Sequence, residues 1–174
     1  ESSDYKVKGK TITYIDSTQY LSISDSTKTP YGASIISEKQ KIFGQNILIQ
    51  FQDSMIQGIH INGDPLIYNS IEAQLSDSGA SQILQDEMYG KIIDIKYYNN
   101  SPSELRIHGM ANSRYNVIEN LLYEGYNEVS GDTIVLSFAD EELNRIQVTG
   151  GARGVFYPNT SISELDTTIY YEAN

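Results

Sequence analysis

Residues 131–150 read GDTIVLSFADEELNRIQVTG, and two related segments precede them: GQNILIQFQDSMIQGIHING at 44–63 and GKIIDIKYYNNSPSELRIHG at 90–109. Each segment begins and ends with glycine, and the two glycines are 19 positions apart in all three copies. Self-similarity of this kind indicates a fold built from repeated structural units.

Apolar side chains occupy every second position on both sides of the middle of each segment. Of the positions between them, only Leu48 and Val135 are apolar. A period of two is typical of strands with one buried face, and it argues against an amphipathic helix. The pattern predicts that fifteen side chains line one shared apolar interior: Ile47, Ile49, Phe51, Ile59, Ile61, Ile93, Ile95, Tyr97, Leu105, Ile107, Ile134, Leu136, Phe138, Ile146 and Val148.

The middle of each segment carries a turn-forming residue, which is Asp53, Asn99 or Asp140. Short side chains of this type bond to their own backbone and stabilise turns, so each segment is predicted to be a pair of strands. The bounding glycines are expected to allow either a positive φ angle or a close approach of the backbone between units.

The segments between the repeats also have the character of strands joined by turns, so each full unit is expected to hold about four strands. We predict a single all-β domain over residues 1–174, with antiparallel strands and little or no helix. It comprises a degenerate first repeat at 9–43 and repeats at 44–89, 90–130 and 131–174. The run at 167–171 resembles the opening strand of a further unit.

The balance of charge excludes one class of partner. The chain has 23 acidic and 12 basic residues and a formal net charge of -11, so it repels nucleic-acid phosphates. It contains no cysteine, which excludes disulfides and thiolate zinc sites.

Two stretches, GDTIVLSFADEELNRIQVTGGARGVFYP and GKIIDIKYYNNSPSELRIHGMANSRY, resemble the OstA-like periplasmic domains of lipopolysaccharide transport, the group of LptA, LptC and the N-terminal part of LptD. The shared pattern is glycine, alternating strand, Asp or Asn turn, alternating strand, glycine, alanine and an aromatic residue. It is carried here by Gly109, Ala111 and Tyr115, and again by Gly150, Ala152 and Tyr157. The resemblance spans roughly residues 44–157.

The resemblance implies an open β-jelly-roll, or β-taco, whose apolar interior shields acyl chains in the periplasm. It implies lipopolysaccharide or a similar lipid as the ligand, and pairing of edge strands with other OstA-like domains, including a head-to-tail homo-oligomer. Attachment to the inner or outer membrane through a segment missing from this chain is compatible with it. The acidic composition departs from this scheme, because it disfavours contact with lipid phosphates and leaves recognition to buried acyl chains.

The remaining polar residues suggest no catalytic, cofactor or metal site. His60 and His108 fall on the predicted outer face and are interpreted as two separate solvated histidines. Asp86 with Glu87, and the run at 140–142, are interpreted as solvated acidic turns. No two carboxylates are placed together on the inner face, so we predict that the protein is not an enzyme and needs no cofactor.

The fifteen inward side chains allow two interpretations, since they either contact a lipid or pack on one another as a closed core. The first leads to a non-enzymatic lipid transport or bridging domain. The second leads to a cell-surface repeat protein, such as an adhesin or glycan-binding module, with a dry core. A third alternative, a β-solenoid enzyme acting on polysaccharide, requires a cluster of carboxylates on one outer face.

Overall fold

The computed structural model describes residues 5–25, 27, 32–75, 79–139, 142–159 and 169–173. Within these ranges the chain forms fifteen strands in one continuous, almost entirely antiparallel sheet, and a three-residue 3-10 turn at Asp16–Thr18 is the only helical segment. The predicted all-β class with little or no helix is confirmed. The strands are β1 (Lys6–Lys8), β2 (Thr11–Ile15), β3 (Tyr20–Ser24), β4 (Ala33–Ile36), β5 (Gln40–Gly44), β6 (Asn46–Gln52), β7 (Met55–Asn62), β8 (Leu66–Gln74), β9 (Ser81–Tyr89), β10 (Ile92–Tyr98), β11 (Ser101–Glu119), β12 (Leu122–Ala139), β13 (Glu142–Thr149), β14 (Ala152–Pro158) and β15 (Ile169–Ala173).

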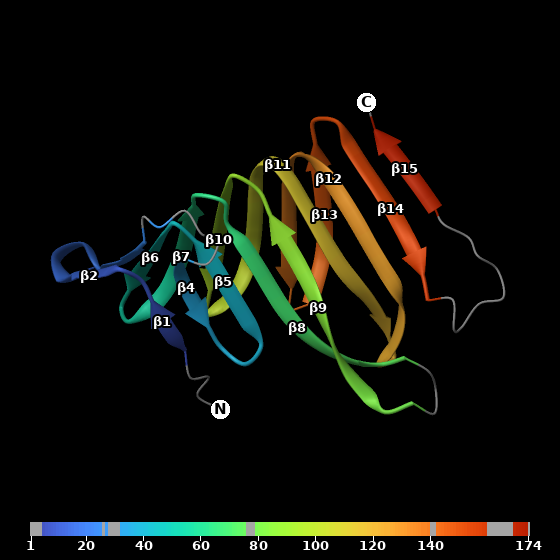
Figure 1. The fold of residues 1–174 in the computed structure, drawn as a ribbon, viewed down its shortest axis with the longest axis horizontal. Helices are drawn as coiled ribbons and strands as arrows, with labels where there is room; N and C mark the ends of the chain where they lie inside the picture. The colour runs from blue at the N-terminus through green and yellow to red at the C-terminus, as the bar shows by residue number, and fades with distance from the viewer. Residues whose placement is uncertain are drawn as a thin grey trace.

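The sheet folds over on itself to form two walls, with the N-terminal strands at one end and β14 and β15 at the other (Figure 1). The first wall consists of β2, β3, β6, β7, β10, residues 101–108 of β11, residues 131–139 of β12, and β13. The second wall consists of β1, β4, β5, β8, β9, residues 111–119 of β11, residues 122–130 of β12, β14 and β15. The line along which the chain passes from one wall to the other is called the crease.

Strands β11 and β12 are long enough to belong to both walls. β11 pairs with β10 as far as His108 and with β9 from Asn112 to Arg114. Between these pairings lies a β-bulge, where Gly109 and Met110 have φ angles of 73° and 51°. The bulge turns the strand without ending it, so the repeat boundary at Gly109 is a bend.

Glycines at the crease permit the close packing that the bend requires. A β-carbon on Gly44, Gly90 or Gly131 would lie 2.5, 2.6 or 2.6 Å from a γ-carbon of Ile61, Ile107 or Val148, respectively. The closing glycines of the same three repeats have positive φ angles of 77°, 73° and 76°. Both expected uses of glycine therefore occur, with close approach at the start of each repeat and positive φ at its end.

The fifteen predicted inward side chains all turn away from solvent. Ten are buried, and Phe51, Tyr97, Phe138, Ile146 and Val148 are half-buried and pack against the same cluster. Residues of the second wall, including Ile42, Ile67 and Met88, belong to this cluster as well. The two walls therefore share one hydrophobic core between their inner faces.

The hairpin turns agree with the sequence prediction where the structure describes them. Asp53 and Ser54, and likewise Asn99 and Asn100, form two-residue turns with positive φ at both positions. Such turns match the twist of the flanking strands. The third predicted turn residue, Asp140, lies outside the described residues.

We expect the crease to be the part of the fold that tolerates substitution least. We expect Gly131→Ala to lower the free energy of unfolding by about 1–3 kcal/mol, because the added methyl group overlaps the half-buried Val148 side chain. In a Val148→Ala background the same substitution should lower the free energy of unfolding by a clearly smaller amount. Urea unfolding of the four proteins in this double-mutant cycle measures the coupling, and an equal cost in both backgrounds would contradict the packing described here.

Candidate functional site

Solvent exposure on the first wall increases with distance from the crease. The row nearest the crease, Ile47, Ile61, Ile93, Ile107 and Ile134, is 0% exposed. The row at the far end of the hairpins, Phe51, Tyr97 and Phe138, is half-buried. We call this far end the mouth of the interior. The partly exposed inward side chains at the mouth are therefore aromatic, and those at the crease are fully buried and aliphatic.

A β-bulge lies opposite each of the three aromatic residues at the mouth, and its extra residue, Gln57, Ser103 or Asn144, is on the returning strand of the hairpin. The strand register shifts between Gln50 and Phe51, between Lys96 and Tyr97, and between Ser137 and Phe138. A bulge bends the strand that contains it, whereas Phe51, Tyr97 and Phe138 keep the inward alternation of their own strands. Because Phe51, Tyr97 and Phe138 occupy equivalent inward positions in the three hairpins, they form an aromatic row along the first wall.

The second wall presents two kinds of row to the interior. Ile42, Ile67 and Met88 lie next to one another on β5, β8 and β9 in the aliphatic core. Two residues further from the crease, Gln40, Asn69 and Asp86 are neighbours in the same register. Because side chains two apart on a strand share a face, this second row also faces inward. It is polar, and Gln40 Nε2 donates a hydrogen bond to Asn69 Oδ1 at 3.0 Å.

Asp86 contradicts the interpretation that Asp86 and Glu87 form a solvated acidic turn. Both residues lie within strand β9, and Asp86 is only 7% exposed. The pairing of β9 with β11 ends at Glu87 and Arg114, and Asp86 Oδ1 accepts hydrogen bonds from the backbone N–H and from Nδ2 of Asn116, each at 2.8 Å. Where β9 diverges from β11, the Asp86 carboxylate thus accepts the backbone hydrogen bond that a neighbouring strand would otherwise accept from Asn116.

Burial governs the ionisation of two inward groups. It raises the pKa of the Asp86 carboxyl, against the opposing effect of the hydrogen bonds from Asn116. Burial, with a smaller contribution from Tyr5, also raises the pKa of Tyr97 to about 12. Tyr97 therefore stays neutral at physiological pH, and the aromatic row carries no charge.

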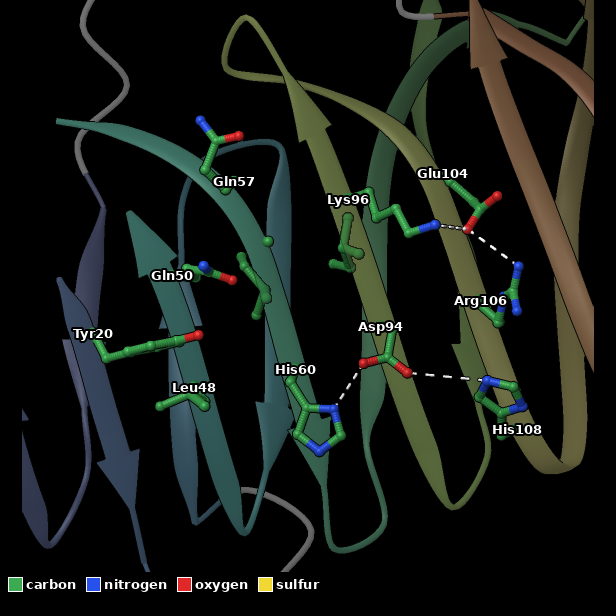
Figure 2. A pocket seen from close by; sticks show the side chains of 13 residues that line it. Tyr20, Leu48, Gln50, Gln57, His60, Asp94, Lys96, Glu104, Arg106 and His108 are labelled. Atoms are coloured by element: carbon green, nitrogen blue, oxygen red, sulfur yellow. Dashed lines mark hydrogen bonds and ion pairs between the residues drawn. The ribbon is translucent and has the colours of Figure 1, made fainter. Parts of the chain in front are cut away.

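A separate depression of about 420 Å³ lies on the outer face of the first wall. Figure 2 shows that two clusters of charged side chains line it. In one, Asp94 lies between His60, at 2.7 Å from Oδ1 to Nδ1, and His108, at 4.0 Å from Oδ2 to Nε2. In the other, Glu104 Oε1 lies 2.9 Å from Lys96 Nζ and 3.3 Å from Arg106 Nη2, and these contacts, above all the hydrogen bond from Lys96, lower the pKa of Glu104.

The two histidines lie on the outer face, as predicted, but they are not separate. Asp94 pairs directly with His60 across β7 and β10, and β11 brings His108 to its other side. The sequence could have predicted this cluster, because the period of two places the side chains of His60, Asp94 and His108 on the outer face of adjacent hairpins. Among the described residues, no three His, Asp or Glu side chains are arranged to hold a metal ion.

The fold was compared with those of known proteins. LptH from Pseudomonas aeruginosa, described as the LptA-homologous periplasmic component of the lipopolysaccharide transport device, superimposes with a TM-score of 0.55 over 97% of this chain and 94% of its own. The chain has the LptH fold. The two sequences are 12% identical over this match, so the likeness extends to the architecture alone.

By sequence, no protein-family model and no curated protein matches the chain. The LptH fold nevertheless confirms the resemblance to the architecture of OstA-like domains and its open β-jelly-roll. The described ranges contain no helix with the length and hydropathy of a membrane span.

The raised pKa of Asp86 predicts a pH-dependent stability. The folded state retains the Asp86 proton more strongly than the unfolded state, so this group favours folding below pH 3.8, and that contribution is lost as pH rises through the folded pKa. We expect Asp86→Asn, which keeps an oxygen acceptor for Asn116, to become progressively more stable than the wild type between pH 4 and pH 7. Unfolding by urea at several pH values tests this, and a stability difference that does not change with pH would refute it.

Proposed function

We propose that this chain is a non-enzymatic lipid transport or bridging domain that works in the periplasm and shields acyl chains between its two walls. The observation that supports this most is the single aliphatic core, continuous over both walls, with half-buried aromatic side chains along its mouth. The LptH fold supports the same proposal, since LptH is a periplasmic component of lipopolysaccharide transport. Lipopolysaccharide, or a lipid with similar acyl chains, is the proposed ligand.

The fifteen inward residues divide into two roles under this proposal. Phe51, Tyr97 and Phe138 at the mouth contact the acyl chains, and the isoleucines at the crease hold the walls together. Burying apolar surface contributes about 25 cal/mol per Å², so a few half-exposed aromatic rings provide a substantial binding free energy. The net charge of -11 favours a ligand that is held by its hydrocarbon rather than by its phosphates.

The ends of the fold support a second part of the proposal, which concerns partners. Strands β1 and β2 lie at the two ends of the sheet path. Ile12 and Tyr14 on β2 have the same parity as the buried Ile23, yet they are 51% and 55% exposed. An exposed edge strand with an uncovered apolar inner face suits pairing with another such domain, so that the two interiors become continuous.

The outer depression favours a different candidate, a glycan-binding module. Its amide, carboxylate and guanidinium groups are suited to sugar hydroxyls, and they lie on the opposite side of the wall from the core. In that case the interior is only a dry core, and lipid does not reach it.

Site-specific photo-crosslinking distinguishes the two candidates. With a photoreactive amino acid at Phe51 or Phe138, we expect adducts with labelled lipopolysaccharide, whereas the outward-facing neighbours Gln50 and Ser137 serve as controls and should give few. Gel analysis of the labelled protein reports the result. Equal labelling at inward and outward positions, or no labelling at any, would contradict a lipid-binding interior.

Self-association through the N-terminal end is also testable. We expect concentration-dependent oligomers in analytical ultracentrifugation, and Ile12→Lys should weaken them at least about tenfold by placing a charge on the apolar inner face. Thr13→Lys, one residue away on the opposite face, is the matched control and should have a smaller effect. A strictly monomeric wild type at high concentration would count against the partner proposal.

A further inference from the structure

The inner face of the second wall contains hydrogen-bonding atoms that no described residue pairs with. Ser113 is 0% exposed, and its Oγ has no hydrogen-bond partner. A buried hydroxyl without a partner costs about 1–3 kcal/mol of desolvation, so the serine at this position calls for an explanation. Alanine would fill nearly the same space at no such cost.

Asp86 lies close to Ser113 on the same face. Ser113 pairs directly with Met88, and Asp86 is two residues along the same strand, which makes the two side chains diagonal neighbours about 7 Å apart. Asp86 Oδ1 is occupied by Asn116, whereas among the described residues Oδ2 has no partner. An acceptor and a potential donor thus lie on the same part of the inner face of the second wall.

The polar row continues across the wall toward β5. Asn69 pairs with Asp86 in the strand register and accepts a hydrogen bond from Gln40, and within the described ranges its Nδ2 donor has no partner. We call Ser113, Asp86, Asn69 and Gln40 the polar strip. Across the interior from it, the mouth of the first wall carries the uncharged aromatic row of Phe51, Tyr97 and Phe138.

The two walls therefore favour different parts of a ligand, since the first offers apolar contacts and the second also offers hydrogen-bonding groups. Hydrocarbon satisfies the aromatic row and the aliphatic core. A plain ester brings a carbonyl acceptor to the polar strip but no donor, which leaves the Asp86 carboxylate desolvated and unpaired. A ligand with both a carbonyl and a neighbouring O–H or N–H satisfies the donor and the acceptor together.

We infer that the polar strip binds the polar junction of the lipid, and that it selects acyl chains that carry a hydroxyl or amide N–H within a few atoms of their carbonyl. This inference rests on the proposed function and specifies its ligand. The O–H or N–H donates to Asp86 Oδ2, the carbonyl accepts from Ser113 or Asn69, and the hydrocarbon tail lies against the aliphatic core of both walls.

Displacement of the neutral fluorescent probe N-phenyl-1-naphthylamine from the purified chain measures this selectivity. The two competitors are methyl 3-hydroxydodecanoate and methyl dodecanoate. For the wild type we expect the hydroxylated ester to displace the probe at about tenfold lower concentration, the effect of one charge-assisted hydrogen bond. Comparison of this ratio between variants cancels the different solubilities of the two esters.

Two variants test the polar strip itself. Asp86→Asn keeps an oxygen for Asn116 but replaces the free acceptor with a donor, and it should reduce the tenfold preference to about twofold or less. Ser113→Ala should lower the preference while leaving thermal stability unchanged or higher, because it removes an unpaired hydroxyl; a serine that merely fills the core would leave the preference unaltered. Glu87→Gln, whose side chain alternates to the outer face of the same strand, is the control and should keep the wild-type ratio.

The possible outcomes distinguish the role of the polar strip from the proposed binding of lipid. Loss of the preference in both variants supports the polar strip. Equal displacement by the two esters in the wild type overturns the inference and leaves lipid binding intact. A preference that persists in both variants overturns the assignment to these residues. Failure of the probe and both esters to bind overturns the proposed function as well.

Discussion

The missing β-carbon at the start of each repeat is the constraint on which the rest of this structure depends. Branched side chains from the closing strand of each hairpin pack against the backbone of Gly44, Gly90 and Gly131 at distances where no other residue fits. The same contact occurs between Gly9 and Ile23 in the degenerate first repeat. A row of equivalent contacts along the chain keeps the two walls close on one side, and the fold is therefore tight at the crease.

The polarity of the interior follows from this geometry. Side chains near the crease are enclosed by both walls and are uniformly aliphatic, whereas those at the mouth are partly exposed and are aromatic on one wall and polar on the other. An interior with an aliphatic floor and two chemically different sides suits an amphipathic molecule better than a pure hydrocarbon. The outer face, with its ion pairs around Asp94 and Glu104, is chemically separate from it.

Much of this architecture could be predicted from the sequence because it depends on local, repeated patterns. The period of two placed fifteen side chains on the inner face, and the spaced glycines marked the crease. The bulges opposite Phe51, Tyr97 and Phe138 were missed because their extra residues, Gln57, Ser103 and Asn144, share no residue type that signals a bulge. Asp86 was misinterpreted because its burial depends on where β9 leaves β11, and the contact of Asp94 with both histidines depends on which hairpins are neighbours.

We propose that a lipid enters the mouth and lies between the walls. The chain has no cysteine, so Asn100→Cys and Asn120→Cys introduce two unique labelling sites, at the β10–β11 turn of the first wall and the β11–β12 turn of the second. Pulsed electron spin resonance between nitroxide labels at these sites measures the span across the mouth. If the lipid lies between the walls, saturating lipopolysaccharide should lengthen this distance and narrow its distribution. An unchanged distribution with lipid demonstrably bound would place the lipid elsewhere and contradict this mode of binding.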